Sequence, residues 1–247
     1  AAIINKLRGE GFKVQINKVG STGSYLSSLL FPEGLNALNI SHWEKVLEYY
    51  SRKTYLPICI IPAGTSLYTT QIREKILSVF EEILINQLNL STQLRTPISY
   101  IISEYMANIV DHAAIDYGMI MVQNNPTKGF LDICILDNGE GLLKTYHKHG
   151  FDEVSTHEEA IIEAINGKST KPMANERGYG LKSTRKMLVE GLGGEYLLHS
   201  GNAFFVWNRN HQQISSFPGN KNWQGTLLFL RLPKNIPTNF NYTSYLE

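Results

Sequence analysis

The order of helical and strand patterns after residue 97 most constrains the fold of this chain. Pro97 can open a helix, and apolar residues then recur at helical spacing over Ile98–Ala114. Two strand patterns follow at Met119–Gln123 and Gly129–Leu136, and a second helical pattern covers Leu181–Glu190. The closing strand patterns are Tyr196–His199, Ala203–Trp207 and Thr226–Leu232. Helices interleaved with strands in this way predict an α/β fold.

The first part of the chain, residues 1–92, predicts an accessory α/β segment without a recognisable motif. Alternating polar and apolar residues indicate a strand over Phe12–Val19, and Ser41 has the chemistry to cap a helix. An apolar run over Tyr55–Ile61 predicts a buried strand, and Gln71–Leu90 has a helical period. We expect this segment to precede the main domain.

The charge balance limits the kinds of partner. Lys and Arg number 23 against 22 Asp and Glu, which argues against non-specific nucleic-acid binding. No apolar run is long enough to span a bilayer and no secretory signal pattern is present, so we expect a cytoplasmic protein without a membrane segment. Cys59 and Cys134 lie in apolar runs, which favours buried, reduced thiols over a disulfide.

One face of the helix after Pro97 carries a polar set. A spacing of four residues places Glu104, Asn108 and His112 on the same side, and Asp111 lies beside them. A carboxylate at 104 can orient or deprotonate a water molecule, and an amide oxygen at 108 is a suitable ligand for Mg²⁺. A solvated face of an amphipathic helix remains the alternative interpretation of this pattern.

The apolar strand at 131–136 runs directly into Asp137-Asn-Gly139-Glu-Gly141. A carboxylate at this place can accept a hydrogen bond from an exocyclic amine such as that of adenine. The glycines allow a sharp turn and a close approach of the backbone to a ligand. A simple β-turn is the alternative, because Asn-Gly pairs are common in turns.

A glycine-containing loop opens the second helix. Its residues are Arg177, Gly178, Tyr179, Gly180, Leu181 and Lys182. Backbone N–H groups and the dipole at a helix start favour an anion, and the two basic side chains add positive charge. A flexible loop without a ligand is the alternative. Later in the chain, Thr226 begins a strand, where its hydroxyl can bond a base edge or a water molecule.

In their order and spacing, these four motifs resemble those of the GHKL ATPases, the superfamily of gyrase B, heat-shock chaperones, histidine kinases and mismatch-repair ATPases. Glu104 to Asn108 is similar to the N box, Asp137 to Gly141 to the G1 box, and Gly178 to Leu181 to the G2 box. The strand from Gly225-Thr226 to Pro233 is similar to the closing motif. The resemblance covers residues 97–235 and implies a Bergerat-type two-layer sandwich of a mixed β-sheet and helices.

The resemblance also implies ligands and roles. It assigns adenine recognition to Asp137 with help from Thr226, a Mg²⁺ ligand to Asn108, and the phosphates to Gly178 and Gly180. We add the neighbouring motif residues to the ATP-binding set: Asp111, His112, Gly139, Gly141, Arg177, Tyr179, Leu181 and Lys182. Residues 142–177 would then form a lid that is mobile without nucleotide, since we expect few apolar anchors outside a helix at Thr156–Asn166.

We therefore expect residues 1–92 as the accessory segment, 93–235 as the ATP-binding domain and 236–247 as a tail. One expected function is ATP hydrolysis or phosphate transfer to a protein partner on another chain. The other is a nucleotide-gated interaction module with little turnover. The N box carries the Glu of the ATPase branch while the second helix is similar to that of histidine kinases, so the motifs do not select one branch.

Two further patterns carry no function in this interpretation. Ser91–Pro97 is superficially similar to the phospho-acceptor box of histidine kinases, but Thr92 stands where those proteins have His. His147, His149 and His157 lack further ligands at zinc-binding spacing, so we expect exposed histidines rather than a metal site.

Overall fold

The protein is an α/β sandwich, seen in a computed structural model that describes residues 1–16, 20–88, 92–111, 117–170, 180–219, 221–235, 237 and 240–245. The helices are α1 (Ala2–Gly9), α2 (Gly20–Ser28), α3 (Trp43–Ser51), α4 (Leu67–Leu88), α5 (Thr92–Asp111), α6 (Gly141–Lys148), α7 (His157–Asn166) and α8 (Gly180–Lys186). A π-helical turn, η2 (Met187–Gly191), continues α8, and a 3₁₀ turn, η3 (Tyr242–Tyr245), lies near the C-terminus. The strands are β1 (Tyr55–Pro62), β2 (Tyr117–Asn125), β3 (Phe130–Asp137), β4 (Glu195–Gly201), β5 (Ala203–Asn208), β6 (His211–Ser216) and β7 (Trp223–Pro233).

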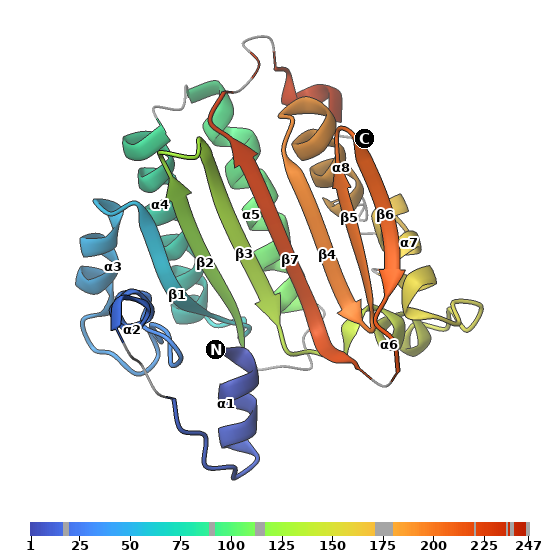
Figure 1. Ribbon diagram of the computed structural model, residues 1–247, viewed down its shortest axis with the longest axis horizontal. Helices are drawn as coiled ribbons and strands as arrows, with labels where there is room; N and C mark the ends of the chain where they lie inside the picture. The colour runs from blue at the N-terminus through green and yellow to red at the C-terminus, as the bar shows by residue number, and fades with distance from the viewer. Residues whose placement is uncertain are drawn as a thin grey trace.

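The seven strands form one sheet in the order β1-β2-β3-β7-β4-β5-β6 (Figure 1). Each neighbouring pair is antiparallel, so the mixed sheet expected from the sequence is corrected to an antiparallel one. Among the described residues, the parallel pairing is limited to an isolated bridge between Leu35 and Cys59. The last strand, β7, enters the middle of the sheet between β3 and β4, which brings Thr226 close to Asp137.

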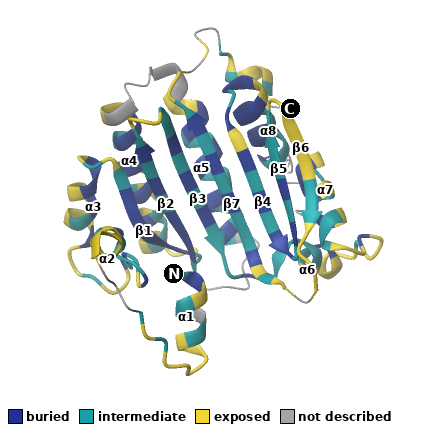
Figure 2. Ribbon diagram, in the orientation of Figure 1, coloured by how far each residue is buried: buried dark blue, intermediate teal, exposed yellow. Residues whose placement is uncertain are grey.

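Helices α4, α5, α7 and α8 lie against one face of the sheet (Figure 1). The residues between these layers are buried, as Figure 2 shows by the dark inner sides of α4 and α5. Ile102, Met106 and Ile109 of α5 belong to this core, as their spacing predicted, while the polar residues 104 and 108 are only partly buried. The helix thus presents a polar stripe at the edge of the core.

The N-terminal segment is continuous with this sheet. β1 pairs with β2 and is buried on both faces, because α4 packs on one side and α1 on the other. Residues 12–16 form no strand, so the strand expected over Phe12–Val19 is wrong where the structure describes it, and 17–19 lie outside the described residues. The alternating side chains at 12–16 find no neighbouring strand with which to pair.

Several local expectations need correction. The helix α3 begins at Trp43, and Ser41 does not cap it, because its Oγ lies 3.4 Å from His42 Nδ1 instead. Pro97 lies inside α5 rather than at its start. A proline removes one backbone hydrogen bond near the start of a helix, and the buried side chains of Ile98 and Ile101 hold the turn that follows.

Candidate functional site

A hollow of about 1040 Å³, including the solvent at its mouth, lies between α5, α6, α7, the start of α8 and the ends of β3 and β7. It brings together Asn108, Asp137, Gly139, Gly141, Gly180, Leu181 and Thr226, seven of the residues selected from the sequence. These residues are up to 118 positions apart in the chain, since Asn108 and Thr226 mark its extremes. Residues from separate motifs therefore share one pocket.

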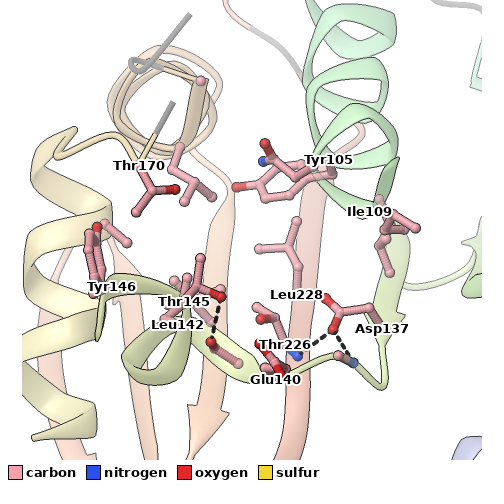
Figure 3. Close-up of a pocket in the computed structure, with 18 of the residues that line it drawn as sticks. Tyr105, Ile109, Asp137, Glu140, Leu142, Thr145, Tyr146, Thr170, Thr226 and Leu228 are labelled. Atoms are coloured by element: carbon pink, nitrogen blue, oxygen red, sulfur yellow. Dashed lines mark hydrogen bonds between the residues drawn. The ribbon is translucent and has the colours of Figure 1, made fainter. Parts of the chain in front are cut away.

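Asp137 ends β3, and its carboxylate lies at one side of this pocket (Figure 3). Its Oδ1 accepts hydrogen bonds from the backbone N–H groups of Gly139 at 2.8 Å and Thr226 at 3.2 Å. Burial raises the pKa of Asp137 above its ordinary value, and these hydrogen bonds counteract part of that rise. The carboxylate is held in a fixed position by the end of one strand and the start of another.

Two glycines provide the space for this arrangement. Gly225 has a φ of +105°, and a Cβ there would overlap the backbone carbonyl of Asp137. Gly141 has a φ of +76°, and a Cβ there would meet Ser200 Oγ at 2.9 Å. The buried Ser200 hydroxyl accepts a hydrogen bond from Leu142 N at 2.9 Å and donates one to Gly225 O at 3.2 Å. Ser200 thereby connects the start of α6 to the start of β7.

Helix α5 supplies the next wall of the pocket. Tyr105, Asn108 and Ile109 line it, and Figure 3 shows Tyr105 and Ile109 on the same helix. Glu104 does not line the pocket: its Oε2 lies against the first residue of α8, so that a Cβ at Gly180 would overlap it. Asn108 is therefore inside the pocket, and Glu104 is at the junction of α5 and α8.

A further wall comes from residues that the sequence analysis did not select. Leu142, Thr145 and Tyr146 of α6 face the pocket together with residues 168–170 after α7 (Figure 3). Tyr146 O–H donates to Lys168 O at 2.8 Å, which fixes the segment after α7 against α6. The helical spacing of Leu142, Leu143 and Tyr146 is the sequence signal for α6, which lies within the expected lid.

The expected lid contains a packed core in its first part. Tyr146, Val154, Ala160 and Ala164 form a buried cluster between α6 and α7. α7 also has a complete capping box at its start, in which Thr156 accepts from the N–H of Glu159. The expectation of few apolar anchors outside the helix is thus wrong for residues 142–155, because Tyr146 and Val154 are buried there against α7. Whether nucleotide changes the mobility of residues 142–177 stays a prediction.

Some predicted site residues lie outside this description. His112, Arg177, Gly178, Tyr179 and the side chain of Asp111 are beyond the described residues. Lys182 is described but does not line the pocket, whereas Leu181 beside it does.

The other expectations concern metal, thiols and membrane. In the described part of the chain, no group of three or more His, Cys, Asp and Glu is arranged to hold a metal ion. His147 and His149 are exposed, while His157 is only partly so. Cys59 and Cys134 are free thiols; Cys59 is buried as expected, whereas Cys134 is only partly buried, and desolvation raises the pKa of Cys134 to about 11. Across the described ranges, no helix has the length and apolarity needed to cross a bilayer.

The residues of this pocket fit a purine nucleotide. Ile135, Leu198 and Leu228 give apolar walls for a planar base, Asp137 gives a hydrogen-bond acceptor beside them, and Gly180 starts a helix. A two-layer sandwich with such a pocket has the shape and chemistry to hold a nucleotide.

The chain belongs to the family of histidine kinase-, DNA gyrase B- and HSP90-like ATPases, whose family model matches residues 93–235. It is therefore an ATP-binding domain of the GHKL type, and the α/β sandwich agrees with that family. No curated protein sequence matches the chain.

Proposed function

We propose that this domain binds ATP together with Mg²⁺ and uses the bound nucleotide either for hydrolysis or for phosphate transfer to a protein partner. The observation that carries the proposal is the position of Asp137 beside an apolar pocket. Both backbone hydrogen bonds to its carboxylate end on Oδ1. Oδ2 is then the acceptor for the exocyclic amine of adenine, and Thr226 holds the same edge of the base.

Asn108 is the residue that would hold Mg²⁺. It lines the pocket on the wall formed by α5. Mg²⁺ takes oxygen ligands and usually keeps several waters, so one amide oxygen together with the phosphates is a sufficient ligand set. Lys168 is the basic residue in the described lining, and its ammonium pairs with the carboxylate of Glu153 at 2.7 Å. The bound ion would therefore supply most of the positive charge that the phosphates need.

Glu104 is the candidate catalytic residue. It precedes Asn108 by one helical turn, and its carboxylate lies beside Gly180 at the start of α8, where a phosphate would be favoured. From this place Glu104 would orient a water molecule or a hydroxyl group of a partner and accept its proton. A general base of this kind contributes about 10²–10⁴-fold to a rate.

The second candidate is a nucleotide-gated interaction module, in which ATP binding changes the affinity for a protein partner and turnover is incidental. One observation favours it: Glu104 lies outside the lining of the pocket and against α8. In that position the carboxylate would contribute to the junction of α5 and α8 instead of acting on a substrate. Both functions require ATP binding, and they differ in the role of Glu104.

One substitution, at Glu104, separates the two functions, and two others test Mg²⁺-dependent binding and serve as the control. ATP affinity is measured by calorimetry with and without Mg²⁺, and phosphate release is measured on the same samples. Asn108→Ala should lose the Mg²⁺-dependent part of binding. Glu104→Gln should keep ATP affinity within about threefold and lose at least about 100-fold in turnover. Glu48→Ala, a change at an exposed glutamate of α3, is the matched control.

The outcomes are distinct. Wild-type turnover that Glu104→Gln abolishes supports the enzyme. A wild-type protein that binds ATP but neither releases phosphate nor labels any added protein supports the interaction module. Absence of Mg²⁺-dependent ATP binding in the wild type refutes both.

A further inference from the structure

A buried arginine lies on the far side of α7 from the nucleotide pocket. Arg185, in the last turn of α8, is 8% exposed. Its guanidinium lies over the ring of Trp207 at 4.4 Å and near that of Phe205 at 6.0 Å. Both rings belong to β5, so the cation is enclosed between a helix and the sheet.

The guanidinium of Arg185 has no hydrogen-bonding partner within the described part of the chain. No hydrogen bond or ion pair to its guanidinium is formed there, and its buried Nε is unpaired. Glu190, Tyr105 and Tyr196 act on it electrostatically, and burial is the main cause that lowers the pKa of Arg185. Tyr105 and Tyr196 bond to each other at 3.0 Å. A buried guanidinium without hydrogen bonds is costly even when it lies over aromatic rings, which makes this position unusual for a purely structural residue.

Arg185 also lines a hollow of about 610 Å³, counting the solvent at its mouth. α7 contributes Ile162, Ile165 and Asn166 to this hollow, and the edge strand β6 contributes residues 212–214. Ala164 on α7 lines the nucleotide pocket instead, so the two hollows lie on different sides of that helix. Figure 2 shows how exposed β6 is at this edge of the sheet. The hollow is therefore separate from the site described above.

We propose that this second hollow binds a small organic monocarboxylate. Two N–H groups at the outer end of a guanidinium form a fork that matches the two oxygens of a carboxylate, while its face can remain stacked on an aromatic ring. Ile162, Ile165 and Phe205 form an apolar surface suited to a hydrocarbon stem. Gln212 and Gln213 add neutral amide groups.

The single charge favours a carboxylate over a phosphate. One guanidinium neutralises one negative charge, and no second Lys or Arg lines the hollow among the described residues. A dianionic phosphate would bring an unpaired charge into a largely apolar space. A carboxylate with an apolar body satisfies both the cation and the surrounding surface.

The test uses the fluorescence of Trp207, which contacts Arg185 directly. The full chain is titrated with sodium hexanoate, with 1-hexanol and with sodium phosphate, each at ionic strength matched with sodium chloride. Hexanoate should give a saturable change in tryptophan emission in the millimolar range. Hexanol and phosphate should change the emission by less than a tenth as much. Trp207→Phe should remove the hexanoate signal, because Trp207 carries the guanidinium of Arg185 over its ring, and Trp43 and Trp223 do not line the hollow.

Variants of the arginine complete the test. Arg185→Met should abolish the hexanoate response and leave the melting temperature equal or higher, because an unpaired buried charge is removed. Arg209→Met, at an exposed arginine in the turn before β6, should respond like the wild type. If Arg185→Met does not fold, Arg185→Lys replaces it and should weaken the response at least tenfold.

Three results would overturn the proposal. An equal response to hexanoate and hexanol would show an apolar pocket only, and a stronger response to phosphate would show the wrong anion. A hexanoate response that persists in the Arg185 variant would place binding elsewhere. ATP affinity measured on the same samples is independent of these results, so failure here does not touch the nucleotide site.

Discussion

The substitution Asp137→Asn replaces one carboxylate oxygen in the nucleotide pocket by an NH₂ group and leaves the shape of the side chain unchanged. The Asn carbonyl can still accept from Gly139 and Thr226, as Asp137 Oδ1 does at 2.8 and 3.2 Å. The NH₂ group then stands in place of Oδ2, where it would face the NH₂ group of adenine. The variant therefore loses one hydrogen bond to the base and places two donors against each other.

The magnitude follows from the burial of this group. A buried donor left without its partner costs about 1–3 kcal/mol, which corresponds to an affinity loss of about 5- to 150-fold. The fold should persist. Burial raises the pKa of Asp137 above the value of 3.8 in an unfolded chain, so the unfolded state ionises this carboxyl more readily. The free energy of unfolding therefore falls as the pH rises from the pKa of the unfolded state through the raised pKa of the folded state. Asn cannot ionise, so the variant does not lose this stability.

Calorimetric titration with ATP and GTP tests the argument, with circular dichroism as the check on folding. Guanine carries an acceptor where adenine carries its amine, so Asp137→Asn should weaken ATP binding and reduce the preference for ATP over GTP. Asp132→Asn is the matched control, because Asp132 lies on the same strand and pairs with Arg231 at 2.7 Å, away from the pocket. An unchanged ATP affinity in a folded Asp137→Asn protein would refute the adenine assignment.

Four more outcomes test the site. Gly225→Ala should lower the free energy of unfolding by about 1–3 kcal/mol, measured with urea, since its φ of +105° strains any side chain; no loss would contradict the geometry. Ser200→Ala should weaken ATP binding by about 0.5–1.5 kcal/mol in calorimetry, and an unchanged Kd would exclude it as a positioning residue. As the pH falls toward the raised pKa of Asp137, wild-type ATP affinity should fall faster than that of Asp137→Asn, and parallel profiles would disprove this. An ATP analogue should slow limited proteolysis within residues 142–177, whereas equal rates would argue against lid closure.

Local patterns predicted the elements whose signals are strong and continuous. The apolar runs at 55–61 and 131–136 predicted β1 and β3, and the apolar spacing of α5 separated its core face from its polar stripe. The weak patterns failed. The short alternation at 12–16 has no strand beside it, and β6, whose residues are mostly exposed, was missed because an edge strand carries little apolar signal.

The sequence by itself determined the α/β class, the ATPase family and the motif residues that form part of the pocket lining, because turns after strands and helix starts are local features with local chemistry. Only the tertiary structure decided that all strand pairs are antiparallel and that Tyr146 and residues 168–170 close the pocket. It also decided that Arg185 lies buried over Trp207. Strand order and burial depend on which distant segments meet, and residue spacing along the chain does not encode that.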